Sequence, residues 1–311
     1  MTTEKYGRVM KGLGGLYETR VEENGVCERI FSRAKGSIHR DEEKVLVGDR
    51  VRLSIDTETP DGVVISEILE RRNSLIRPPI ANLDYIFIVF SALKPQPVLE
   101  TVDKLISIAE YNSIEPVVVI TKTDLSSSEA EKYRALYERA GIEAFMTSSE
   151  TGEGIDVLSS YVREHLHGGK TAAFAGASGV GKSTLMNALF PNLSLATAEI
   201  SKKIQRGRHT TRHVEIFEIE DSADTGFLAD TPGFSLIDFE RFDFMPLEAL
   251  ISTFRDISKF QGKCRYADCA HVGERADECA VARATEKGLI SDSRLASYRA
   301  IYKVLKAKSN Y

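Results

Sequence analysis

One eight-residue loop constrains the fold of this chain more than any other feature. It fits the pattern G-x-x-x-x-G-K-[ST] and consists of Gly176, Ala177, Ser178, Gly179, Val180, Gly181, Lys182 and Ser183. Glycines let such a loop curl its backbone N–H groups around a phosphate. Lys182 would reach the β- and γ-phosphates, and Ser183 would ligate Mg²⁺, with Thr184 next in the chain.

The flanking segments decide between a binding loop and a glycine-rich turn that fits the pattern by chance. Residues 171–175 are expected to form a strand, and a helix is expected over 182–190. A strand, a loop and a helix in this order place the helix N-terminus at the phosphate. The sequence therefore predicts an α/β domain with a phosphate-binding loop.

A second loop follows about 50 residues later, where Asp230-Thr231-Pro232-Gly233 comes after the strand-like stretch 226–229. Asp230 can hold the Mg²⁺ shell, and the Gly233 N–H can reach the γ-phosphate. Alone, the pattern D-x-x-G is usually only a turn. Its spacing after the phosphate loop favours the nucleotide interpretation.

A base-recognition motif, Thr121-Lys122-Thr123-Asp124, follows the buried-strand pattern of residues 116–120. The carboxylate of Asp124 can accept hydrogen bonds from guanine N1–H and the exocyclic amine, which adenine does not offer. Asp124 could instead cap the helix that starts nearby, and the motif alone leaves both options open. Ser148 and Ser149 resemble a loop that supports guanine O6.

The central region alternates strands with helices. Strands are expected at 85–90 and 116–120, and helices at 99–111, 130–140 and 154–165. The strand patterns are apolar throughout, as in a parallel sheet covered on both faces. The base motif precedes the phosphate loop by more than 50 residues, which indicates a circularly permuted domain.

The N-terminal region alternates short β-type runs with Gly and Asp turns, which predicts an OB-type barrel over residues 1–70. Residues 71–79 are expected to form a linker, because they end in Pro78-Pro79. Cys27 lies in a strand pattern and is expected to pack in the interior. The predicted domains are 1–70, 71–240 and 241–311.

The C-terminal region holds the spacing Cys264-x₄-Cys269-x-His271-x₇-Cys279. Three thiolates and an imidazole make a closed tetrahedral set, which is typical of structural zinc. Buried reduced cysteines are the alternative, and the polar residues around them argue against it. Around this cluster the pattern is mainly helical and ends in an amphipathic stretch over 293–306.

Charge and hydropathy limit the expected partners and cellular compartment. The net charge is −5, yet residues 255–311 carry 12 Lys and Arg against 7 Asp and Glu, so a nucleic-acid partner stays open. No apolar run approaches the roughly 20 residues that a membrane helix needs. The first residues carry no export pattern. We therefore expect a cytoplasmic, reducing context without membrane contact.

Taken in order, these features resemble one family, the circularly permuted GTPases called ribosome small-subunit-dependent GTPase A (RsgA or YjeQ). The barrel, the segment 72–79, the permuted motifs, the run 207–211 and the cysteine cluster carry the resemblance. It implies OB-fold, GTPase and zinc domains. It also implies a monomer whose GTP hydrolysis, with Mg²⁺, is stimulated by the 30S ribosomal subunit in late small-subunit maturation, with 16S rRNA binding and release.

Two departures from the family pattern concern the site. Thr121 stands where the family usually has Asn, although guanine selectivity depends mainly on Asp124. Arg212 stands where a third threonine is common, which leaves open whether Thr210 or Thr211 contacts Mg²⁺.

Phe234 occupies the place where many GTPases have a glutamine that orients water. His209 is the candidate catalytic replacement, and the alternative is an exposed loop histidine.

Two other function classes compete with a GTPase. A nucleotide-independent RNA-binding module would not need the intact Lys182, Ser183 and Asp230. A phosphate-loop kinase would not need Asp124 or the switch threonines. The sequence thus favours a GTPase over both.

Overall fold

The computed structural model describes residues 2–36, 38, 44–56, 62–191, 214–219, 224–230, 241 and 243–309. The chain divides into two compact units, each built from three segments. One comprises Met1–Asp84, Ser160–Phe174 and Phe190–Phe234, and the other Tyr85–Ser159, Ala175–Leu189 and Ser235–Tyr311.

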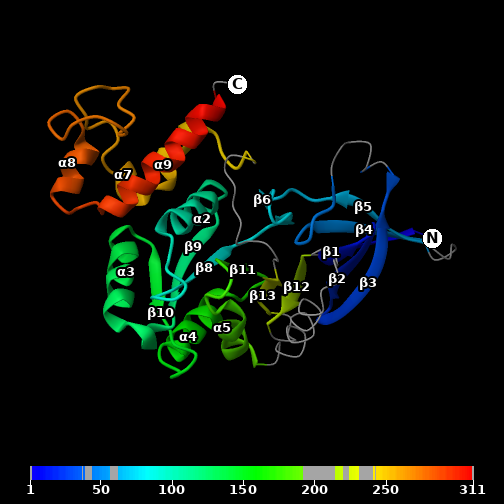
Figure 1. Ribbon diagram of the computed structural model, residues 1–311. Coiled ribbons are helices and arrows are strands. Elements are labelled where there is room, and N and C mark those ends of the chain that lie inside the picture. The colour runs from blue at the N-terminus through cyan, green and yellow to red at the C-terminus, as the bar shows by residue number, and fades with distance from the viewer. Residues whose placement is uncertain are drawn as a thin grey trace. The chain divides into compact units, whose positions relative to one another are not determined.

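A closed five-stranded barrel forms the N-terminal part of the first unit (Figure 1). Its strands are β1 (Thr2–Leu13), β2 (Leu16–Glu23), β3 (Val26–Ala34), β4 (Arg50–Asp56) and β5 (Val63–Ile68). The pairings run from β1 to β2, β3, β5, β4 and back to β1, and only β3–β5 is parallel. The predicted OB-type barrel is therefore confirmed.

Two tight turns set the register of the first three strands. The central residues of each turn have positive φ, at 58° and 79° for Gly14 and Gly15 and at 53° and 78° for Asn24 and Gly25. Such two-residue turns match the twist of antiparallel strands. They let β1 and β2 run longer than the short strands expected from the sequence.

The barrel interior is filled by aliphatic side chains that alternate with outward-facing residues. The core comprises Val9, Val21, Ile38, Val45, Val51, Leu53 and Ile65. The expectation that Cys27 packs there is wrong, because its side chain is exposed and its Sγ accepts a hydrogen bond from Arg20 at 2.9 Å. Cys27 is the second residue of β3, and the first four residues of this strand are all exposed.

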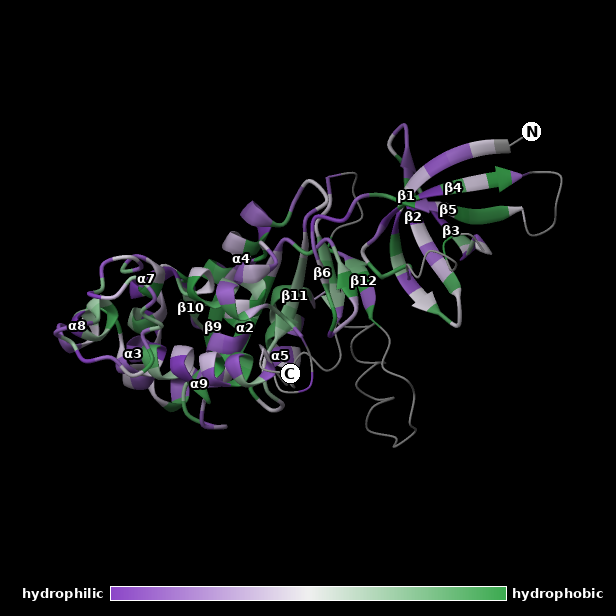
Figure 2. Cartoon of the chain, turned by 90° about the horizontal axis from the view of Figure 1, so that it is seen from above, coloured by the Kyte–Doolittle hydropathy of each residue, from purple (hydrophilic) through white to green (hydrophobic). Residues whose placement is uncertain are grey.

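Three further strands belong mainly to the first unit: β11 (Thr171–Ala175), β12 (Glu215–Glu218) and β13 (Phe227–Asp230). Strand β13 pairs in parallel with β11 and antiparallel with β12. Strand β11 is buried along its length, and Figure 2 shows it mainly in the colour of hydrophobic residues. Strand β12 was not predicted, because it is short and begins and ends in glutamate.

Segment 71–79 is held to the barrel by an ion pair and contributes one strand to a small hairpin. Arg71 Nε lies 2.7 Å from the buried Asp49 carboxylate. Strands β6 (Ser74–Leu75) and β7 (Ile80–Ala81) pair antiparallel, so the segment that was expected to be a linker carries its own local structure.

The second unit contains the parallel strands β8 (Tyr85–Ser91), β9 (Glu115–Thr121) and β10 (Glu143–Met146) in the order β10-β9-β8. Helix α2 (Leu99–Tyr111) packs against β8 and β9, and helix α3 (Ser127–Arg139) packs against β9 and β10. Helices α4 (Ile155–His165) and α5 (Lys182–Leu189) follow. All these elements lie within three residues of the predicted ranges, except β10, which was not predicted.

The C-terminal region is mainly helical, as expected. It contains η3 (Leu247–Thr253), α7 (Arg255–Ser258), α8 (Ala280–Glu286) and α9 (Asp292–Ser309). Helix α9 lies beside α2 (Figure 1) and also contacts η3. Figure 2 shows hydrophilic and hydrophobic stretches mixed along α9, as in a helix that packs on one face. None of the helices in the described part of the chain is long and apolar enough to span a bilayer.

Candidate functional site

The loop that follows β11 has a backbone that only glycine adopts without strain. Gly176, Gly179 and Gly181 have φ values of 143°, 79° and 100°. A Cβ on Gly176 would lie 2.1 Å from the carbonyl oxygen of Val89, at the end of β8. The loop can therefore lie directly against β8 only with glycine at this position.

Lys182 begins α5 and folds back over the loop. Its Nζ donates to the carbonyl oxygens of Gly176 and Ala177, both at 2.7 Å. Burial lowers the pKa of Lys182 below the ordinary lysine value. Ser183 and Thr184 are exposed beside it. The start of the helix thus combines a cation, two hydroxyls and the N–H groups of a helix N-terminus, which suits an anion.

The base motif at the end of β9 is hydrogen-bonded to this loop. Thr121 Oγ1 lies 2.5 Å from the carbonyl oxygen of Val180. Lys122, with a φ of 56°, donates from Nζ to the carbonyl oxygens of Gly179 and Lys94, at 2.7 and 2.9 Å. Two segments more than 50 residues apart in sequence therefore form one constellation. The contribution of Lys94 was not foreseen, because a backbone carbonyl leaves no sequence signal.

Asp124 faces a second loop. Its exposed carboxylate, in the short helix η1 (Thr123–Leu125), accepts a hydrogen bond from the Ser148 hydroxyl at 2.5 Å. The residue that caps α3 is Ser126, whose hydroxyl accepts from the Glu129 N–H at 3.4 Å. The alternative in which Asp124 is the helix cap is therefore wrong.

The loop after β10 is shaped around Ser148. The Ser148 N–H donates to the Glu153 carbonyl oxygen at 2.9 Å, and the Ser148 hydroxyl accepts from the Thr151 N–H at 3.2 Å. A Cβ on Gly154 would lie 1.9 Å from the Met146 carbonyl oxygen, so glycine closes this loop. Ser149 is exposed next to Ser148, in the loop that the Ser148 hydroxyl joins to Asp124.

Asp230 is the last residue of β13 and is partly buried. Burial raises the pKa of its carboxyl group, with a smaller contribution from the charge of Glu215. A bound cation would favour the ionised form. His209, Thr210, Thr211 and Gly233 lie outside the described residues.

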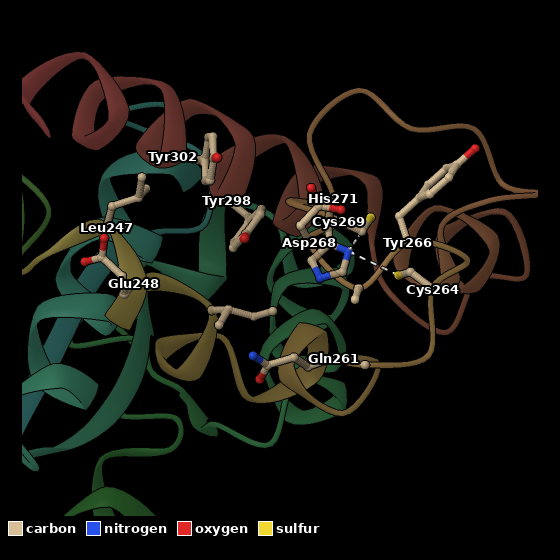
Figure 3. A pocket seen from close by; sticks show the side chains of 13 residues that line it. Leu247, Glu248, Gln261, Cys264, Tyr266, Asp268, Cys269, His271, Tyr298 and Tyr302 are labelled. Carbon is tan, nitrogen blue, oxygen red and sulfur yellow. Dashed lines mark hydrogen bonds between the residues drawn. The ribbon is translucent and has the colours of Figure 1, made fainter. Parts of the chain in front are cut away.

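The C-terminal cluster brings four metal-ligating atoms together, as Figure 3 shows for Cys264, Cys269 and His271. His271 Nδ1 lies 3.5, 3.4 and 3.4 Å from the sulfurs of Cys264, Cys269 and Cys279. The sulfurs of Cys264 and Cys279 are 3.9 Å apart. Tetrahedral zinc would set these separations at roughly 3.6 Å for N to S and 3.8 Å for S to S. The cluster can therefore hold a metal ion.

Backbone donors and neighbouring helices complete this centre. The Ala280 N–H donates to Cys264 Sγ at 3.2 Å, and the Ala282 N–H donates to Cys279 Sγ at 3.4 Å, which stabilises thiolates. Burial lowers the pKa of His271, so its ring stays neutral and able to bind metal. A cavity of about 270 Å³ opens between the cluster, η3 and α9 (Figure 3).

Comparison with known families covers most of the chain. The family model described as RsgA GTPase matches residues 68–240, and the model of the RsgA N-terminal domain matches residues 6–64.

Relatives and solved structures match along nearly the whole length. The chain is 40% identical over 303 residues to the small ribosomal subunit biogenesis GTPase RsgA of Caldanaerobacter subterraneus subsp. tengcongensis. This alignment covers 97% of this chain and 96% of that protein. It is 40% identical over 305 residues to the small ribosomal subunit biogenesis GTPase RsgA 2 of Listeria monocytogenes, with 96% and 97% covered. YjeQ from Thermotoga maritima superimposes with a TM-score of 0.77 at 32% identity, covering 98% of this chain and 99% of that one. YloQ, described as a circularly permuted GTPase, gives 0.75 at 32% identity, with 98% and 96% covered.

Proposed function

Because this chain belongs to the RsgA family of GTPases, we propose that the small (30S) ribosomal subunit stimulates its hydrolysis of GTP late in that subunit's assembly. The protein is a GTP hydrolase that converts GTP and water to GDP and phosphate, and it acts in ribosome biogenesis. In our proposal it binds 16S rRNA as a cytoplasmic monomer and leaves the subunit when GTP is hydrolysed.

One observation carries the nucleotide proposal. The hydrogen bonds from Thr121 and Lys122 to the phosphate loop join the two halves of a permuted site. Asp124 and the loop of Ser148 and Ser149 would read guanine. The phosphates would lie in the loop that ends at Lys182, with Gly233 reaching the γ-phosphate.

Catalysis in this site depends mainly on placing water and stabilising charge. Hard oxygen donors suit Mg²⁺, which Ser183, Asp230 and either Thr210 or Thr211 would hold and which would offset charge on the β- and γ-phosphates. Lys182 would neutralise the same oxygens. Phe234 offers no hydrogen bond to water, so we assign the orientation of the attacking water to His209, and intrinsic hydrolysis should be slow without the subunit.

The other regions would serve binding to the subunit. We propose three domains, a barrel over 1–70, a permuted GTPase domain over 71–240 and a zinc-binding domain over 241–311, and the ranges of the two family models support this division. Zinc at Cys264, Cys269, His271 and Cys279 would be structural, since no open ligand position remains. The excess of 12 basic over 7 acidic residues in 255–311 suits rRNA phosphates.

The deciding experiment measures GTP turnover with and without purified small subunits, with large subunits and free rRNA as controls. We expect an acceleration of about 10³-fold or more that is specific to small subunits, as when a GTPase site is completed in trans. Slow turnover that no subunit changes would contradict the proposed stimulation.

A further inference from the structure

Arg294 of α9 is buried between two carboxylates. It is 1% exposed, and Asp103 and Asp256 are 1% and 6% exposed. Its Nη1 donates to Asp103 Oδ1 at 2.6 Å, while Nη2 and Nε donate to the two oxygens of Asp256 at 3.0 and 3.2 Å. Its guanidinium also lies 4.5 Å from the ring centre of Phe254. One cation thus joins α2, α7 and α9 in an interior where each of these charges would be costly alone.

From this cluster, interacting side chains and one backbone carbonyl lead toward the nucleotide site. The Asp103 charge acts on the buried Tyr137 of α3, and burial together with that charge raises the pKa of this tyrosine. The rings of Tyr137 and Phe90 are 6.0 Å apart in an edge arrangement. Phe90 lies in β8, and its carbonyl oxygen is 3.2 Å from Thr121 Oγ1, the atom that also contacts Val180 of the phosphate loop.

In the other direction, α9 holds the metal loop. The Tyr298 hydroxyl donates to the Ala270 carbonyl oxygen at 3.2 Å, and Arg299 Nε donates to the His271 carbonyl oxygen at 3.1 Å. Both residues lie within two turns of Arg294 on the same helix. The backbone of a metal-ligating residue is therefore fixed to the helix that carries Arg294.

Arg255, the residue before Asp256, also attaches the C-terminal region to neighbouring elements. It contacts the carboxylates of Glu110 and Glu115 at 2.5 and 2.9 Å and the Gly141 carbonyl oxygen at 2.8 Å. These partners lie at the ends of α2, α3 and β9. Arg255, and Arg294 through Asp103, thus connect the C-terminal region to α2 and its neighbouring elements at two separate places.

We propose that Arg294 is a positioning residue for guanine nucleotide binding, through which the C-terminal helix and its metal loop hold α2, α3 and the end of β8 in the binding arrangement. The inference depends on the nucleotide site proposed above. The buried arrangement places the Arg294 cation against both carboxylates, so losing it should shift all three elements together. By linkage, metal occupancy and nucleotide affinity should then favour each other.

The test measures the Kd of a fluorescent GDP analogue for the full chain, for Arg294→Met and Arg294→Lys, and for Lys303→Met, which removes an exposed cation from the same helix. We expect Arg294→Met to weaken GDP binding about 5- to 150-fold. The Kd of Arg294→Lys should lie between those of Arg294→Met and the unmodified protein, and the Kd of Lys303→Met should equal that of the unmodified protein. Simple loss of folded protein would lower the signal amplitude and leave Kd unchanged.

A second measurement does not require any variant to fold. Metal is removed from the unmodified protein with a chelator, and GDP affinity and hydrogen exchange are recorded. We expect weaker GDP binding and faster exchange in α2 and around residues 121–125. Metal loss that changes neither would overturn the inference, as would a folded Arg294→Met with unchanged Kd. If the unmodified protein bound no GDP, the proposed function itself would fail.

Discussion

The Thr121 hydroxyl lies 2.5 Å from the Val180 carbonyl oxygen, although the two residues are 59 positions apart in the sequence. The family to which the chain belongs usually has asparagine at this place. Here a shorter side chain contributes one hydroxyl to the link between base motif and phosphate loop, beside the bond from Lys122 Nζ to the Gly179 carbonyl oxygen. Thr121 is 3% exposed, so the bond is shielded from water and has no ready substitute.

Thr121→Val should therefore weaken GDP binding. Valine keeps the shape and leaves the Val180 carbonyl oxygen without this donor, a loss of about 1–3 kcal/mol, or roughly 5- to 150-fold in Kd. Titration with a fluorescent GDP analogue measures it. Thr121→Ser restores the hydroxyl and should bind nearly normally; equal binding by the valine variant would show that the contact does not support the site.

Asp124→Asn should change base preference. The carboxylate accepts two hydrogen bonds from guanine, whereas an amide offers one acceptor and one donor, which matches xanthine. We expect GDP affinity to fall by roughly 10- to 100-fold, as for hydrogen bonds to a charged group, and xanthosine diphosphate affinity to rise. Ser148→Ala is the companion variant, because it removes the 2.5 Å hydrogen bond to Asp124 and should weaken GDP binding without a change of base preference.

Nucleotide affinity should fall at alkaline pH. Burial lowers the pKa of Lys182, so the free protein loses this charge below the pH at which exposed lysines do. Bound phosphates favour the charged form and raise that pKa, so binding takes up a proton between the two values and Kd rises with pH. Lys182→Met should bind weakly with no such slope. A Kd for the unmodified protein that stays flat through the lysine range would contradict the assignment.

The cysteine cluster should hold one zinc per chain. Cys279→Ser should lose the metal, because it removes one of four ligands of a closed site, and should open residues 260–280 to proteolysis. Cys27→Ser is the matched control, since Cys27 is exposed and distant in sequence. Mass spectrometry of metal content gives the answer; full zinc content in Cys279→Ser would refute the ligand set.

His209→Ala should separate binding from catalysis. GDP affinity should stay unchanged, while turnover with small subunits should fall about 100-fold or more, the usual worth of a group that positions or activates water. His213→Ala, four residues away, should retain turnover. Stimulated turnover that survives in His209→Ala would remove this residue from the mechanism.

Much of the fold could be predicted because its signals are local. The buried strands β8, β9 and β11 are apolar runs bounded by polar loops, and the structure places them within one residue of the expected ranges. The barrel could be predicted from the glycines in the turns between its strands. Strand β12 was missed because its four residues depend on pairing with β13 and β1.

The residues of the candidate site also differ in how far they could be predicted from local sequence. Side chains with a fixed chemistry, such as Lys182 and the four metal ligands, could be predicted from spacing alone. Contacts that depend on distant partners could not. Arg294 lies in a segment predicted as an amphipathic helix, and nothing near it in sequence indicates burial, because its partner Asp103 is 191 positions away. The prediction that Cys27 is buried was wrong for a related reason, because a strand pattern does not show which end of the strand is exposed.

The late position of Arg294 also bears on how the protein is made. During synthesis α2 and α7 leave the ribosome first, carrying Asp103 and Asp256 without a counter-charge. Only when the chain has grown past α9 can these carboxylates be neutralised and the helices close. A product that stops short of residue 294 cannot complete this interior, so it should remain susceptible to proteases. Only the chain that includes α9 would then form the nucleotide site.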